Sequence, residues 1–197
     1  MMKTNDQILT IKSVILYILE SFPKGIDNLK LYKLMYFAQQ EHLCRFGRTI
    51  FDDTFKALHL GPVPTFTQKA FECHIMNDEM TENMRQFCQS FEVTKVSNDH
   101  NKQVTRISST DKPDMDELSK SDVECLDNTI KKYGKMTAYA LSDLSHGDQA
   151  WKDTREKMKE DPEMNRITSV EILKAANASP EMIDYVKENI RIMNALS

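Results

Sequence analysis

Apolar residues recur at helical spacing along most of this chain. Over residues 8–22 they fall three or four positions apart, as on one face of an amphipathic helix. Thr4 and Gln7 precede this pattern as a capping box, in which the two side chains satisfy free backbone N–H groups of the first turn. Pro23 and Gly25 follow it and are typical of a helix end. The pattern therefore predicts a first helix that ends before Pro23.

A second helix is predicted over residues 28–46, with Asp27 as its capping residue and Gly47 as its terminator. Its apolar side chains point in nearly every direction around the axis. A helix that is apolar on all sides is typically buried on all sides. We therefore expect this helix at the centre of the fold.

Three segments have patterns that favour strands. Residues 91–97 and 102–108 alternate apolar and polar positions on either side of a short polar turn, which predicts a β-hairpin. Residues 54–59 have no helical period and several residues compatible with a strand. Because two strands alone are marginally stable, we expect 54–59 to join the hairpin as a third strand.

Most of the rest of the chain is expected to be helical. Pro64 suits the first turn of a helix that continues to about residue 74, and Gly61-Pro62 is expected to form the turn before it. Further helices are predicted at about residues 119–133, 137–144 and 149–160, and in the C-terminal region 168–195. The fold class is therefore mainly α: a compact helical domain of about seven to nine helices with a small antiparallel β-sheet or hairpin.

Composition and charge narrow the possible functions. The chain has 197 residues, 40% hydrophobic and 28% charged, which suits one globular domain over 1–197. The formal net charge of −4 provides no general basic surface for nucleic acid. No apolar run approaches the roughly 20 residues of a membrane span, and no signal-peptide cleavage pattern is found. The four cysteines are scattered and form no CxxC pair, which favours reduced thiols in a cytoplasm.

The sequence carries no signature of catalysis, metal or cofactor. It lacks a nucleophile elbow, a Walker loop and an HExxH motif. Cys73 and His74 are adjacent on a predicted helix, so their side chains diverge and do not form a good zinc pair. Asp52 and Asp53 have two interpretations, as metal ligands or as a cap before the next element, and we favour the cap. We expect no enzyme activity, no metal and no cofactor.

The segment HLGPVP interrupts the helical pattern at residues 59–64. His59 lies beside Gly61, and His146 lies beside Gly147, so each histidine borders a glycine turn. Trp151, the only tryptophan, follows the second turn. It is either a core anchor for its amphipathic helix or an interface anchor, since tryptophan is enriched at binding hot spots.

Several segments together resemble a known family. In order they are KLMYFAQ (33–39), FGRTIFDD (46–53), FKALHLGPV (55–63) and LSKSDVECLDNTIKKYGKMTAYALSDLSH (118–146), with Trp151 close behind. Their order and spacing are similar to those of the Panacea domain, also described as SocA-like or GepA-like phage-associated protein. The resemblance covers about residues 28–155. It departs from the family pattern at GPVPTF and weakens beyond about residue 165.

The resemblance implies a mostly helical antitoxin of bacterial and prophage toxin–antitoxin pairs, which neutralises a cognate toxin by direct binding. Delivery of the toxin to a protease, with the antitoxin as adaptor, stays open. One interpretation of the glycine turns is that they only end one secondary-structure element and begin the next. The other is that a toxin-contacting surface gathers there from His59, Gly61, Pro62, His146 and Trp151.

Two rival functions stay open at this point. The helices over residues 119–144 have the length of a helix-turn-helix, which would suit a DNA-binding regulator. Lys131, Lys132 and Lys135 are a small basic spot only, so we expect no specific nucleic-acid binding by the free protein. A weaker rival is a hydrolase that pairs His59 or His146 with one of the two adjacent aspartates.

Overall fold

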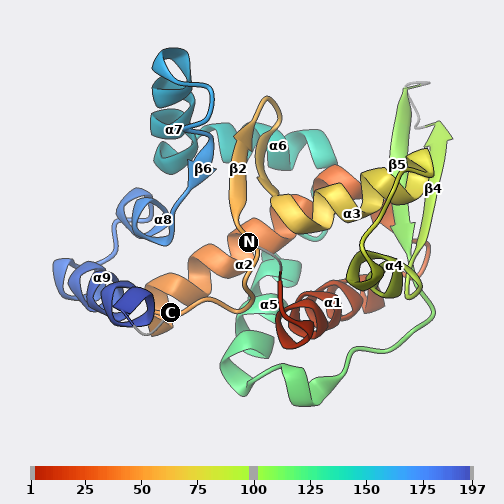
Figure 1. Cartoon of the computed structure of the whole chain (residues 1–197), viewed down its shortest axis with the longest axis horizontal. Coiled ribbons are helices and arrows are strands. Elements are labelled where there is room, and N and C mark those ends of the chain that lie inside the picture. Colours follow the sequence, from red (N-terminus) through yellow and green to blue (C-terminus); the bar gives the residue numbers. More distant parts are fainter. Residues whose placement is uncertain (1–2, 98–101, 196–197) are drawn as a thin grey trace.

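A computed structural model describes residues 3–97 and 102–195 of the chain (Figure 1). Within these ranges it contains nine α-helices, one short 3-10 helix and six strands, so the expectation of a mainly helical fold is confirmed. The helices are α1 (Asn5–Glu20), α2 (Asn28–Phe46), α3 (Thr65–Met76), α4 (Glu82–Cys88), η1 (Met115–Glu117), α5 (Lys120–Tyr133), α6 (Ala138–His146), α7 (Gln149–Glu160), α8 (Ser169–Ala175) and α9 (Pro180–Ala195). The strands are β1 (Ile26–Asp27), β2 (Phe55–Leu58), β3 (Gly61–Pro64), β4 (Glu92–Ser97), β5 (Gln103–Ser108) and β6 (Arg166–Ile167).

Helix α2 lies at the centre of the molecule, as its all-round apolar pattern predicts. Figure 1 shows it running through the middle, with α1, α3 and α4 toward one side and α7, α8 and α9 toward the other. Leu34, Met35 and Tyr36 are three consecutive residues of α2 and all are fully buried. Three neighbours in sequence can only be buried together if other elements surround the helix.

Three of the helices begin at capping boxes, including the one at Thr4 and Gln7 that the sequence predicts. At α1 the Thr4 hydroxyl accepts from the backbone N–H of Gln7, and the Gln7 side chain accepts from the backbone N–H of Thr4. The same reciprocal pairs begin α5, at Ser119 and Asp122, and α8, at Thr168 and Glu171. These helix starts are therefore encoded locally.

The predicted hairpin is present, but its third strand is not the one expected. Strands β4 and β5 are antiparallel, with Val93 opposite Ile107 and Val96 opposite Val104. The third strand of this sheet is β1, where Ile26 pairs with Ile107. The assignment of residues 54–59 to this sheet is therefore wrong. The short β1 comes just before α2, so the placement of α2 brings it to the hairpin.

Residues 55–58 do form a strand, but in a second sheet with the order β3-β2-β6. Gly61–Pro64 is expected as a turn and a helix start, and instead forms β3, with Val63 opposite Lys56. The turn is one step earlier, at His59 and Leu60. The third strand, β6, comes from the C-terminal region and has only two residues, too few for a recognisable strand pattern.

Helix α4 is not anticipated by the sequence patterns. Its seven residues start at Thr81, whose hydroxyl accepts from the backbone N–H of Met84. The helix buries Phe87 against Phe71, with ring centroids 5.6 Å apart, and against Phe91 at 5.1 Å. Tertiary packing of this ring accounts for a helix too short to be stable by propensity alone.

No helix among the described residues combines the length and apolar content that crossing a bilayer requires.

Candidate functional site

The turn between β2 and β3 projects from the second sheet between α6 and α7 (Figure 1). We call this turn, His59 and Leu60, the tip. Both residues are exposed, and Leu60 leaves 41% of its surface open to solvent. A two-residue turn usually carries glycine, asparagine or aspartate, so a leucine here is not explained by turn formation.

Side chains of the flanking helices bind the backbone of the tip at three consecutive carbonyl oxygens. The Trp151 indole N–H donates to Leu58 O at 2.9 Å, and His146 Nε2 donates to His59 O at 3.0 Å. The Ser142 hydroxyl donates to Leu60 O at 2.9 Å. Each bond fixes a different peptide group, so together they hold the tip in one conformation before any partner arrives.

Trp151 and His146 also contact each other. Their rings are stacked, with centroids 4.4 Å apart and planes 28° apart. Asp148 positions this pair because its carboxylate accepts from the backbone N–H of Ala150 at 2.8 Å and so caps α7. Both rings are half-buried. The tryptophan therefore has core contacts on one side and an open side.

Gly61 lies directly beneath the tip, where the chain passes very close to α2 and α6. Its φ of +97° lies in the region that favours glycine. A Cβ atom at this position would lie 2.2 Å from Ser145 Oγ and 3.0 Å from Lys33 Nζ. The interruption at residues 59–64 is therefore a site of close approach that only glycine permits.

Lys33 is fully buried and donates a hydrogen bond from Nζ to Pro62 O at 2.6 Å. Burial lowers the pKa of this amine to about 7. No carboxylate among the described residues forms an ion pair with it. The lysine of KLMYFAQ therefore holds the proline of GPV in place.

The structure gathers three of the five proposed partner-binding residues around the exposed turn: His59, His146 and Trp151. Gly61 and Pro62 are buried, so they support this surface and are not part of it. Leu60 is exposed beside them and is missed by the sequence patterns. The signal that could have found it is its apolar character in a turn between two strands.

Comparison with protein families identifies the family of this chain. The model of the antitoxin SocA-like, Panacea domain family matches residues 31–152. The chain belongs to this family. The match begins in α2 and ends at residue 152, so it contains the tip, the whole of α6 and the start of α7 with Trp151. Comparison with curated proteins and with solved structures gives no match.

A second cluster joins three segments of the Panacea domain. His42, which is fully buried, lies with Nδ1 2.8 Å from Arg48 O and Nε2 2.9 Å from Asp122 Oδ1. Arg48 contacts the same carboxylate oxygen at 3.3 Å. Burial alone would raise the pKa of Asp122, but hydrogen bonds from His42 and Ser119 and the Arg48 charge hold it below its usual value.

This cluster is not a nucleophilic triad. In a triad the serine and the carboxylate bind opposite nitrogens of the histidine. Here Ser121 Oγ, at 3.2 Å, and Asp122 both approach Nε2 of His42, while Nδ1 faces a backbone carbonyl. The cluster instead connects α2 to the start of α5. The sequence contains all its members but no pattern that joins them.

The two adjacent aspartates have separate roles. Asp53 is buried and accepts from the backbone N–H groups of Phe66 and Thr67, at 2.9 and 3.0 Å, so it caps α3 from outside that helix. Asp52 is exposed and forms an ion pair with Lys3. Both precede β2, whereas His59 follows it. At about 3.3 Å per strand residue the separation from Asp53 to His59 is about 20 Å, so these two residues do not form a hydrolase pair.

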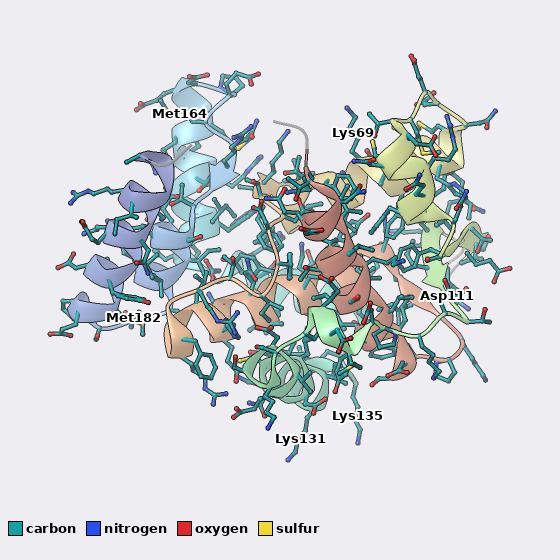
Figure 2. The ribbon with its side chains drawn as sticks, turned by 60° about the horizontal axis from the view of Figure 1, so that its bottom comes forward. Lys69, Asp111, Lys131, Lys135, Met164 and Met182 are labelled. Atoms are coloured by element: carbon teal, nitrogen blue, oxygen red, sulfur yellow. The ribbon has the colours of Figure 1, made fainter. Side chains whose placement is uncertain are left out.

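The helix pair considered for DNA binding presents few cations. The second helix, α6, has no lysine or arginine, and its exposed side chains include Tyr139 and Asp143. Lys131, in the last turn of α5, and Lys135, just after that helix, lie on the same side of the molecule (Figure 2). Cations at a helix C-terminus are favoured by the helix dipole, which gives them a structural explanation.

Within residues 3–97 and 102–195, no group of three or more histidine, cysteine or acidic side chains is placed to hold a metal ion. All four cysteines are free, and Cys88 and Cys125 are buried. Burial raises the pKa of Cys88 to about 12 and that of Cys125 to about 11.

Proposed function

We propose that this protein neutralises a cognate toxin in the cytoplasm by binding it directly, and that the tip forms the centre of the contact. Membership of an antitoxin family supports a toxin partner in general. The tip supports this location because it is exposed, apolar at Leu60, and flanked by the stacked rings of His146 and Trp151. The proposed contact surface is His59, Leu60, His146 and Trp151.

The observation that carries this proposal is the set of three hydrogen bonds to the carbonyls of residues 58–60. An exposed loop normally loses conformational freedom when a partner binds. Here the flanking helices have already fixed the backbone, so less of the binding free energy is spent on ordering. A rigid turn with a leucine at its apex and a tryptophan at its side has the composition of a binding hot spot.

The mechanism we propose is occlusion. The tip enters a depression on the toxin, Leu60 and the open side of the Trp151 ring are desolvated there, and His59 lies at the polar rim. Delivery of the bound toxin to a protease would require the same first step. Helix α7 carries several charged side chains, most of them exposed, and these provide polar groups beside the contact surface.

The decisive experiment is co-expression with the product of the neighbouring gene, using Leu60→Glu as the test variant. Leu144→Glu is a matched control because Leu144 is 43% exposed, close to the 41% of Leu60. It lies two residues from His146 on α6 and therefore points about 160° away from that ring. We expect Leu60→Glu to abolish rescue of growth and Leu144→Glu to preserve it.

Both variants should melt within about 2 °C of the unaltered protein, because substitutions at exposed positions usually change stability by less than about 0.5 kcal/mol. Full rescue by Leu60→Glu, with the toxin still bound in a pull-down, would show that the tip is not the contact. Loss of rescue by both leucine variants would show that the contact is not confined to the tip and also includes the part of α6 around Leu144.

A further inference from the structure

A groove of about 490 Å³ lies at the end of β2 opposite to the tip. It is formed where α1 and α3 begin, next to β6 and the start of α4. Its charged lining is Lys3, Asp52, Asp53, Lys69 and Arg166. The volume falls within the usual range of small-molecule sites, about 300 to 1,000 Å³.

Two cations of this groove have no carboxylate partner. Lys69 and Arg166 are exposed, and among the described residues neither forms an ion pair. Lys56 is not part of the groove lining, but it lies directly opposite Arg166 where β2 pairs with β6, and it too forms no ion pair among the described residues. Like charges directly opposite in an antiparallel pair are destabilising. An anion bound beside Lys56 and Arg166 would relieve this repulsion. The two cations lie together although the chain as a whole carries a formal net charge of −4.

The two carboxylates of the groove are already occupied. Asp52 binds Lys3 and also accepts a hydrogen bond from Gln7. Asp53 is buried and bonded to the first turn of α3 through Phe66 and Thr67. Neither forms an ion pair with Lys69 or Arg166, and the three cations and two carboxylates of the lining leave it with a formal net charge of +1.

The rest of the lining is partly apolar and partly hydroxylic. Ile8, Phe66 and Met84 contribute apolar surface, and Thr54, Thr65 and Thr81 contribute hydroxyl groups. The N-terminal ends of α1 and α3 also border this region, but their first N–H groups are already capped, by Thr4 at α1 and by Asp53 at α3. An anionic group attached to a ring or another apolar part would match this combination.

We propose that this groove binds a phosphate-bearing small molecule of nucleotide size. Lys69 and Arg166 hold the phosphate groups, as lysine and arginine commonly do, and the apolar lining contacts the remainder of the ligand. The site is distinct from the tip, and it does not depend on the proposed antitoxin function. Ligand binding in the groove would affect toxin neutralisation only if the groove and the tip were energetically coupled. The binding test below does not require this coupling.

The test is calorimetric titration of the purified protein with ATP, with inorganic pyrophosphate and with hexaglutamate. The groove variant is Lys69→Gln with Arg166→Gln. The control variant is Lys131→Gln with Lys135→Gln, which removes the same charge at a place far from Lys69 (Figure 2). We expect the unaltered protein to bind ATP, the groove variant to bind it at least tenfold more weakly, and the control to stay within twofold.

Comparing pyrophosphate with ATP separates the contribution of the phosphate groups to binding from that of the rest of the ligand. Binding of pyrophosphate, weaker than that of ATP, would support the proposal that phosphate is held by the cations and that the ring adds contacts. The proposal is overturned if ATP and pyrophosphate both fail to bind, or if the groove and control variants lose affinity equally. Tighter binding of hexaglutamate than of ATP would also overturn it, because the groove would then suit an acidic peptide. Both variants should melt like the unaltered protein without ligand, since all four substituted residues are exposed.

Discussion

The buried ammonium group of Lys33 and the backbone carbonyl of Pro62 are joined by a hydrogen bond of 2.6 Å. This bond connects the central helix to the strand beneath the tip. The lysine has no carboxylate partner among the described residues, although isolated buried charges are costly. A lowered pKa resolves this, because a neutral amine still donates to the carbonyl.

The first prediction concerns pH and stability. The pKa of Lys33 is lowered from 10.5 to about 7 on folding. Between these values the unfolded chain binds a proton that the folded chain does not, so the free energy of unfolding rises with pH. Below pH 7 both states are protonated and this contribution is constant. From pH 7 to 8.5 we expect a gain of about 1 to 2 kcal/mol in urea unfolding.

Lys33→Met should remove this gain, whereas Lys131→Met, at an exposed position, should keep it. The measurement must stay below pH 9. Burial raises the pKa values of Cys88 and Cys125, so above pH 9 the unfolded thiols lose protons first and stability falls. An equal pH slope in all three proteins would show that Lys33 is not the group responsible.

The second prediction is that Gly61→Ala destabilises the protein. The new Cβ would meet Ser145 Oγ at 2.2 Å and would occupy a backbone with φ of +97°. We expect a loss of about 2 to 4 kcal/mol from strain and displacement. Gly147→Ala is the control, because Gly147 has φ of −70° and its nearest contact would be 3.1 Å away. Thermal melting should separate the two, and equal melting temperatures would contradict the close approach.

A third prediction concerns the buried carboxylate. Asp122→Ala removes the partner of His42 and Arg48 and also breaks the capping box of α5. We expect a loss of about 3 kcal/mol, typical of breaking a buried pair. Glu124→Ala removes only the exposed pair with Arg45 and should cost less than about 1 kcal/mol.

The sign of the pH effect provides an independent check on this carboxylate. The pKa of Asp122 is lowered on folding, so its contribution is present above the unfolded value and is lost as pH falls through the folded value. The difference in free energy of unfolding between the unaltered protein and Asp122→Ala should therefore be smaller at pH 3 than at pH 7. A constant difference between the two would assign the loss to packing.

The fourth prediction is that Trp151→Ala affects both stability and neutralisation. Since the ring is half-buried, we expect a stability loss of about 2 kcal/mol, less than the 3 to 5 typical of a fully buried aromatic. As a toxin anchor it should also lose about thirtyfold in affinity. Trp151→Phe keeps an aromatic ring and loses only the bond to Leu58 O, so it should cost about 1 kcal/mol. An unchanged melt with full rescue by Trp151→Ala would refute both roles.

Much of the architecture follows from neighbours in sequence. The capping boxes at Thr4, Ser119 and Thr168 begin helices where the sequence predicts them. The all-round apolar pattern of residues 28–46 places α2 at the centre, and the order of motifs identifies the family. These features depend on residues three or four positions apart or on the composition of a segment. Both kinds of information can be read from a single sequence.

Only the tertiary structure decides which distant segments meet. The strand at residues 55–58 pairs with Gly61–Pro64 and with Arg166–Ile167, and not with the hairpin as expected. The alternation of a strand tells which of its sides is buried, but its backbone groups pair equally well with any strand that the helices bring alongside. The same packing buries Gly61 and Pro62, exposes Leu60, and sets Lys56 opposite Arg166. Local sequence therefore determines the elements, and packing around α2 determines the surfaces on which function depends.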